Sequence, residues 1–269
     1  MKLRLVMADP AGNRTALVLT PVPRERRAPL SRALMALPEL RAEQVGFACP
    51  PKGRDALGRL EMMGGEFCGN AARSFGLLLA EKQGPGPRTV PIEISGCGEV
   101  LWVEARPESR FAASPMPLPL ALDSLSVPAI SPKALPAVLL PGITHVIVRE
   151  AAPSPAAFRA VRQAAAARWD WEALGALFLS PRGELTPAVA VRATGTAVFE
   201  SSCASGSTAL ALWLARDLAR GERTFPIPQP GGTLTVRVAK AEGRITALTV
   251  GGPVALEPPR EVEIEEDEP

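Results

Sequence analysis

The chain has 269 residues, of which 46% are hydrophobic and 22% are charged, a balance typical of a globular protein with one large core or two moderate ones. Its 30 basic and 28 acidic side chains leave a net charge of +2, and aromatic residues make up only 4%, with no tyrosine. Scattered charge and few stacking side chains argue against nucleic-acid binding. No apolar run reaches the roughly 18–20 residues that span a bilayer, and the N-terminus lacks signal-peptide features. We therefore expect a cytoplasmic protein with neither nucleic acid nor membrane as a partner.

Short apolar runs bounded by glycine and proline predict strands near both ends of the chain. They are Leu3–Met7, Thr15–Thr20, Val100–Glu104, His145–Val148, Ala188–Val191 and Thr233–Val238. Between them, Pro29–Leu40 and Ser154–Trp171 carry apolar residues at helical spacing. Many short strands with a few helices predict a mixed α+β fold.

The middle of the chain changes composition, because prolines crowd residues 112–141. Proline at this density argues against a continuous helix and against a central strand. We expect an N-terminal lobe over 1–114, a proline-rich crossing over 115–141 and a C-terminal lobe over 142–250. The segment 250–260 is expected to return to the first lobe, and the acidic residues 261–269 to form a solvated, frayed tail.

Four cysteines lie at positions 49, 68, 97 and 203, and no pair has Cys-x-x-Cys spacing. The single histidine, His145, has no partner histidine, so the sequence predicts no metal site. Cys49 and Cys97 have no chemical context and are interpreted as small buried hydrophobes.

An internal repeat surrounds the other two cysteines. Cys68–Ala80 and Cys203–Ala215 each begin with cysteine, continue through small and polar residues and then become strongly apolar. A pattern that occurs once in each half predicts two lobes of similar plan. Helices this apolar are expected to be buried on all sides.

A cysteine directly before a helix has particular chemistry. The free N–H groups of the first turn and the helix dipole favour negative charge, so the thiol ionises more easily and a carboxylate can bind there. Two such helix ends facing one amino acid would place a sulfur on each side of its α-carbon. One thiolate would remove the α-proton while the opposite thiol delivers another, without pyridoxal phosphate.

At these motifs the sequence resembles the diaminopimelate epimerase superfamily of two-cysteine racemases and epimerases. The resemblance is carried by Cys68-Gly69-Asn70-Ala71-Ala72-Arg73, Cys203-Ala204-Ser205-Gly206, Gly12-Asn13 and Gly142-Ile143-Thr144-His145, the last without the family's Asn-Pro. It implies two pseudo-symmetric lobes, each a curved mixed sheet around a central helix, with the active site in the cleft between them.

The resemblance also implies roles for individual residues. Cys68 and Cys203 would be the two bases, and Asn13 would contact the substrate. The amides of four motif residues would hold the α-carboxylate: Gly69, Asn70, Ala204 and Ser205. Glu66 and Glu200 are candidates for binding the α-ammonium or side chain, and the alternative for each is a surface or capping carboxylate. For His145 the alternatives are a residue that contacts the substrate and a structural histidine, with its hydrogen bonds made within the protein, at the start of a strand.

The differences between this sequence and the diaminopimelate epimerases indicate the substrate class. Diaminopimelate epimerases carry an arginine shortly before the second cysteine, whereas Val191–Glu200 contains only the displaced Arg192. Met62–Ala71 and Phe199–Cys203 instead resemble the histidine racemases that feed opine-type metallophore synthesis. The resemblance thus implies a cofactor-independent isomerase, a racemase of a single-carboxylate amino acid, with histidine as the leading substrate.

Other interpretations of the sequence remain open. Within the same chemistry they are a diaminopimelate epimerase and a proline-racemase-like enzyme. From other classes they are a thiol redox or metal-trafficking protein and a ligand-binding protein without turnover. The sequence leaves the oligomeric state open, with a homodimer among the alternatives.

Overall fold

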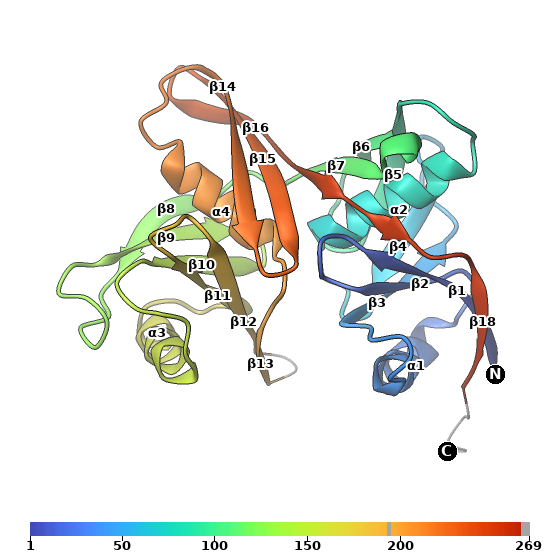
Figure 1. Ribbon diagram of the computed structural model, residues 1–269, viewed down its shortest axis with the longest axis horizontal. Coiled ribbons are helices and arrows are strands. Elements are labelled where there is room, and N and C mark those ends of the chain that lie inside the picture. The colour runs from blue at the N-terminus through green and yellow to red at the C-terminus, as the bar shows by residue number, and fades with distance from the viewer. Residues whose placement is uncertain (193–194, 265–269) are drawn as a thin grey trace. The chain divides into compact units, whose positions relative to one another are not determined.

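The computed structural model describes residues 1–192 and 195–264 and has the mixed α+β fold that the sequence predicts (Figure 1). The chain forms two compact units. Unit 1 comprises Met1–Pro115 with Gly251–Pro269, and unit 2 comprises Met116–Val250. The chain leaves unit 1 after Pro115 and re-enters it within strand β16 (Arg244–Pro253).

Unit 1 is built on a mixed sheet. Its strands are β1 (Lys2–Asp9), β2 (Thr15–Val18), β3 (Gln44–Cys49), β4 (Gly58–Met62), β5 (Arg88–Ile94), β6 (Leu101–Arg106) and β7 (Phe111–Pro115), and they lie in that order. β2–β3 and β4–β5 pair in parallel, and the other neighbours pair antiparallel. β17 (Ala255–Leu256) and β18 (Arg260–Glu263) bring the returning chain onto β1. The helices are α1 (Arg24–Ala36), α2 (Gly69–Glu81) and the short 3-10 turn η1 (Pro107–Ser109).

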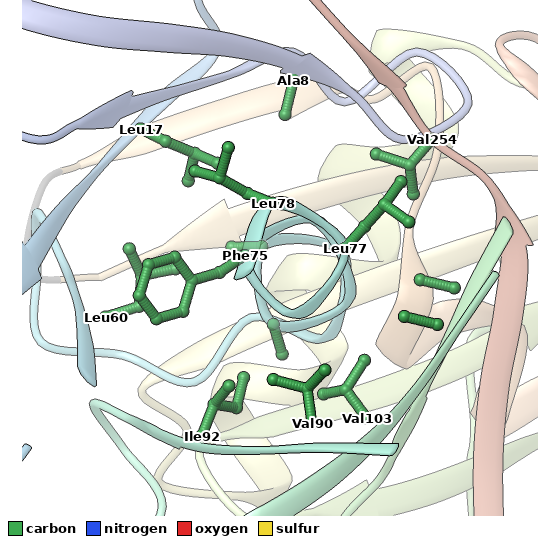
Figure 2. Close-up of a cluster of buried hydrophobic side chains, with 14 of the residues drawn as sticks. Ala8, Leu17, Leu60, Phe75, Leu77, Leu78, Val90, Ile92, Val103 and Val254 are labelled. Carbon is green, nitrogen blue, oxygen red and sulfur yellow. The ribbon is translucent and has the colours of Figure 1, made fainter. Parts of the chain in front are cut away.

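Helix α2 is the centre of this unit. It contacts four strands of the sheet, β4 to β7, and nearly all of its residues are buried. Figure 2 shows Phe75, Leu77 and Leu78 projecting from α2 in different directions, into side chains from the surrounding strands and from Val254 of the returning segment. The helix that follows Cys68 is therefore enclosed, as its all-round apolar sequence predicts.

Unit 2 contains a six-stranded sheet and a helix of the same kind. The sheet order is β13 (Thr196–Phe199), β12 (Leu185–Val191), β11 (Ala173–Leu179), β10 (Ile143–Val148), β9 (Leu135–Leu140) and β8 (Ala121–Leu125), with β10–β11 the parallel pair. α4 (Ala204–Leu214) contacts β9, β10 and β11 as well as the hairpin of β14 (Gly221–Gln229) and β15 (Gly232–Ala241). α3 (Pro155–Arg168) packs through Phe158, Val161 and Ala165 into a core shared with this sheet.

Most predicted elements are confirmed, since each of the six predicted strands overlaps an observed one. Ser154 caps α3 by accepting the Ala157 N–H at 3.1 Å. α1, however, begins at Arg24, five residues before the predicted Pro29. Pro29 is the sixth residue of α1, so it removes one hydrogen bond inside the helix without ending it.

The proline argument against a central strand is wrong for β9, which lies between β8 and β10. Pro136 opposes Ser124 of β8, and the pairing of β9 with β10 begins only at Ala137. The proline thus sits where its missing N–H breaks no bond to β10. Residues 116–141 belong to unit 2.

The prediction of a solvated, frayed tail is also wrong for residues 261–264, the described part of 261–269. Val262 pairs with Leu3 in the β18–β1 ladder, and Ile264 is buried with an N–H that donates to Met1 O at 2.9 Å. Apolar residues alternate with the glutamates here, so one face can be buried while the charges stay in water. Residues 265–269 lie outside the described residues. No helix among those described combines the length and apolar character needed to cross a membrane.

Candidate active site

The two motif cysteines occupy the same backbone position. Cys68 is the N-cap of α2 with φ −134° and ψ 111°, and Cys203 is the N-cap of α4 with φ −131° and ψ 112°. Each sulfur accepts the N–H three residues later, from Ala71 at 3.5 Å and from Gly206 at 3.4 Å. At both sites one first-turn amide thus donates to the sulfur, and such a helix N-terminus favours negative charge.

Cys68 is half-buried beside a cluster of polar side chains from the sheet. The Gln44 amide, at the start of β3, contacts Cys68 Sγ at 3.4 Å. The same nitrogen donates to Asn13 Oδ1 at 2.6 Å and to Thr15 Oγ1 at 2.7 Å. The structure therefore connects Asn13 with Cys68 through Gln44, a residue that the sequence did not single out.

Arg73, five residues after Cys68 in α2, is fully buried. Its guanidinium donates to Pro10 O at 2.7 Å, to Pro253 O at 2.9 Å and to Asn70 Oδ1 at 3.2 Å. Burial lowers the pKa of Arg73 to about 9, an effect that a negative charge on Cys68 opposes. Because charge interactions are reciprocal, Arg73 favours the thiolate form of Cys68.

Two residues that follow β5 contact the loop before Cys68 and fix its backbone. Ser95 Oγ donates to Glu66 O at 2.8 Å, and the next residue, Gly96, has φ +70°. A Cβ at Gly96 would lie 2.3 Å from the Phe67 nitrogen, so only glycine fits there. Glu66 itself is exposed, and its carboxylate lies near Gly64 rather than within a described contact to Cys68.

Cys203 is buried, and its backbone is fixed by Gln229 at the end of β14. The Cys203 N–H donates to Gln229 Oε1 at 2.8 Å, and Gln229 Nε2 donates to Ser207 Oγ at 2.9 Å. Ser207 Oγ in turn donates to Cys203 O at 2.8 Å. This closed set of hydrogen bonds, also absent from the sequence prediction, fixes the start of α4.

A short polar chain leads from the Cys203 sulfur to His145. Ser205 Oγ lies 3.4 Å from Cys203 Sγ and 2.9 Å from His145 Nε2. His145 is fully buried in β10, and burial lowers its pKa to about 3, so its imidazole is neutral at physiological pH. Its register partner in β11 is Gly175, where a Cβ would lie 2.0 Å from His145 Nδ1. His145 thus reaches Cys203 through Ser205.

Glu200 interacts with Cys203 through its charge and a side-chain hydrogen bond, both of which raise the pKa of the Cys203 thiol. Burial, followed by the Glu200 charge, raises the pKa of the Cys203 thiol well above its usual value, against the hydrogen bonds from Ser205 and Gly206. Of the two candidate glutamates, Glu200 therefore affects the pKa of the cysteine that follows it. Among the described contacts, Glu66 makes none with Cys68.

The predicted residues fall into two groups. Unit 1 holds Asn13, Glu66, Cys68, Gly69 and Asn70, and unit 2 holds His145, Glu200, Cys203, Ala204 and Ser205. Sequence reasoning missed Gln44, Gln229 and a role for Arg73. The signal for Arg73 was present, as a single arginine inside an apolar helix. Gln44 and Gln229 are brought to the cysteines by contacts over 24 and 26 residues, which no local pattern reveals.

Comparison with known proteins identifies the family. The family described as "Histidine racemase CntK N-terminal domain" matches residues 2–258. The histidine racemase of Fusobacterium nucleatum subsp. nucleatum (strain ATCC 25586) is 33% identical over 267 residues, covering 94% of each chain. The histidine racemase of Staphylococcus aureus (strain Mu50) is 24% identical, covering 90% of this chain and 94% of that one.

Solved structures agree on the fold. A probable proline racemase from Agrobacterium radiobacter K84 superimposes with a TM-score of 0.71 at 14% identity, over 98% of this chain and 93% of the other. At that identity the likeness shows the fold alone. The sequence match covers nearly the whole chain, and the chain accordingly belongs to the histidine racemase family and is an isomerase of the racemase and epimerase class.

Proposed function

We propose that the protein is a cofactor-independent histidine racemase in which Cys68 and Cys203 exchange protons with opposite faces of one α-carbon. The observation that carries this proposal is the matched geometry of the two cysteines, each an N-cap whose sulfur accepts a first-turn N–H at 3.4–3.5 Å. Both helix ends favour negative charge, as a thiolate base and a substrate carboxylate require.

The proton balance is simple. In one direction, a Cys68 thiolate takes the α-proton and becomes a thiol, while the Cys203 thiol gives its proton to the opposite face and becomes a thiolate. In the other direction the two roles exchange. The negative charge that develops on the substrate carboxylate is stabilised by the first-turn amides of Gly69, Asn70, Ala204 and Ser205.

Residues that contact the two cysteines support this chemistry. Gln44 contacts both Cys68 Sγ and Asn13, so a substrate held by Asn13 would lie beside the sulfur that acts on it. In unit 2, Glu200 and Ser205 interact with Cys203, and His145 contacts Ser205. We infer that His145 orients Ser205 and does not touch the substrate, because it is fully buried.

Histidine is favoured over diaminopimelate on two grounds. The first is that the chain matches a histidine racemase over 94% of that protein's length. The second is Arg192, the cation nearest to the position where a diaminopimelate epimerase carries its arginine. Arg192 pairs with Asp170 and lies 4.8 Å from the centroid of the Trp171 ring, so it is engaged elsewhere. A second substrate carboxylate would need a free cation.

Racemisation of a panel of amino acids tests the proposal. The reduced protein is incubated with L-histidine, D-histidine, LL-diaminopimelate or L-proline, and the enantiomers are separated by chiral chromatography. Histidine is expected to approach a 1:1 mixture from either side. Turnover of diaminopimelate or proline but not histidine would overturn the substrate assignment. Binding of histidine without inversion would overturn the proposed activity.

A further inference from the structure

The charges around the two cysteines differ although their helix positions match. Five residues after the cysteine, α2 carries Arg73 where α4 carries Thr208. Three residues before it, the first motif has Gly65 where the second has Glu200. A buried cation therefore accompanies Cys68, and a carboxylate accompanies Cys203.

The Arg73 charge lacks a carboxylate partner. Its three hydrogen-bond acceptors are the neutral oxygens of Pro10, Pro253 and Asn70, and across residues 1–192 and 195–264 it forms no ion pair with an aspartate or glutamate. A fully buried charge is costly unless an opposite charge lies nearby.

The Arg73 side chain reaches back to the N-terminal end of α2, because its Nε donates to Asn70 Oδ1 at 3.2 Å, two residues after the Cys68 cap. Two groups there can be anionic, Cys68 and Asp9, and a negative charge on either opposes the effect of burial on the Arg73 pKa. The Asp9 carboxylate is already engaged, since it accepts the Gly12 N–H at 2.7 Å and pairs with Arg14 at 3.5 Å. Glu43 adds a carboxyl on the Asn13 side, but it is exposed, so solvent screens its charge. Cys68 is therefore the group best placed to balance Arg73.

We propose that Arg73 is a positioning residue whose charge holds Cys68 as the thiolate of the resting protein, while Cys203 rests as the protonated thiol. The catalytic meaning of these two states rests on the proposed two-base function, but the states themselves exist without substrate. After one inversion Cys68 is the thiol and Cys203 the thiolate. The resting form returns when Cys68 releases its proton to water and Cys203 takes one from water.

The pH dependence of alkylation of the substrate-free protein tests this assignment. Iodoacetamide is applied between pH 5 and 10, and peptide mass spectrometry measures the rate at each cysteine separately. The two cysteines are compared by the pH at the midpoint of each rate curve. Their absolute rates are not compared, because Cys203 is more buried and the reagent reaches it more slowly. The Cys68 midpoint is expected below about 8.5, the value of a free thiol, and the Cys203 midpoint above it. The reverse order, or equal midpoints, would overturn the proposal.

Variants of Arg73 separate charge from structure. Arg73→Met should slow Cys68 alkylation at pH 7 by about tenfold, the effect of removing one nearby opposite charge, whereas Arg73→Lys should retain most of the rate. Thr208→Val, at the matched position of α4, should leave Cys68 alkylation unchanged. Equal loss in the Lys and Met variants, or none in Met, would contradict the role. If Arg73→Met does not fold, the wild-type midpoints still decide.

The two proposals fail separately. A low Cys68 midpoint in a protein that inverts no amino acid would leave the charge assignment intact and remove the racemase. Racemisation with a Cys68 midpoint above that of Cys203 would retain the racemase and remove the role of Arg73.

Discussion

Cys68 and Cys203 show how the same residue type at the same helix position acquires different chemistry from its neighbours. The first-turn amides are common to both sites, at 3.5 and 3.4 Å. The differences come from residues that contact the sulfur from other elements, Gln44 at Cys68 and Ser205 with Glu200 at Cys203. The proposed acid–base pair therefore depends on side chains that only the fold brings to the sulfurs.

Replacing either motif cysteine tests the proposed base pair directly. Cys68→Ser and Cys203→Ser should each lower the racemisation rate by roughly 10²–10⁴-fold, because a hydroxyl is a far weaker base than a thiolate. Cys49→Ser and Cys97→Ser are matched controls and should retain wild-type rates. Binding of L-histidine, measured by calorimetry, should persist in the two motif variants. A motif variant with wild-type turnover would remove that cysteine from the mechanism.

His145 provides a pH test, because it is the only histidine in the chain. Its folded pKa of about 3 lies below the unfolded value of about 6.5. Below pH 6.5 the unfolded chain takes up a proton that the folded chain does not, so the free energy of unfolding falls as pH falls toward 3. Above pH 6.5 this contribution is fully present and constant.

The imidazole resonance in the proton NMR spectrum should therefore not move between pH 5 and 8, and the thermal midpoint should decrease below pH 6.5. A resonance that titrates with a midpoint near 6.5 would contradict the burial of His145 behind Ser205.

Helices α2, α3 and α4 each begin at a residue whose side chain caps the first turn, whereas α1 has no side-chain cap. The repeat of Cys68–Ala80 and Cys203–Ala215 predicted both central helices, because the cysteine cap and the apolar run are local features. The resemblance also supplied Glu200 and His145 as candidates, but not what they contact. Their contacts with Cys203 and Ser205 depend on strand register, such as His145 opposite Gly175, which a local pattern does not encode.

Substitution of Gly96 tests whether this residue fixes the loop before Cys68. Gly96→Ala places a methyl 2.3 Å from the Phe67 nitrogen at a φ of +70°, so the free energy of unfolding should fall by about 1–3 kcal/mol. Gly98→Ala is the matched control, because its Cβ meets no atom within 4 Å and should change stability little. Urea unfolding of both variants measures the difference. Equal stabilities would show that Gly96 does not hold the loop.

In the molecule as a whole, unit 1 is completed by residues far along the chain. Pro253 O accepts from Arg73, Val254 is buried in the α2 core, and Glu257 pairs with Arg14 at 2.7 Å. No local pattern specifies the contacts of the segment 250–260, which join residues up to 243 positions apart. Composition alone carries no signal for such pairings.

Truncation after Val250 should therefore destabilise unit 1 selectively. Removing Pro253 and Val254 takes an acceptor from the buried Arg73 and an apolar side chain from the core around α2. Hydrogen exchange should show faster amide exchange in α2, with α3 of unit 2 unchanged. Truncation after Ile264, which keeps all of these contacts, is the control. Equal protection of α2 in both proteins would contradict this dependence.

The proposed mechanism requires two bases that act on opposite faces of one α-carbon. The most direct measurement is racemisation of L-histidine in deuterated water, with mass spectrometry of both enantiomers at early times. Two bases predict D-histidine that carries deuterium at the α-carbon, because the donating thiol has exchanged with solvent, and remaining L-histidine that does not. Early D-histidine that retains the original proton would mean that one base returns the proton it removed, and the two-base mechanism would be wrong.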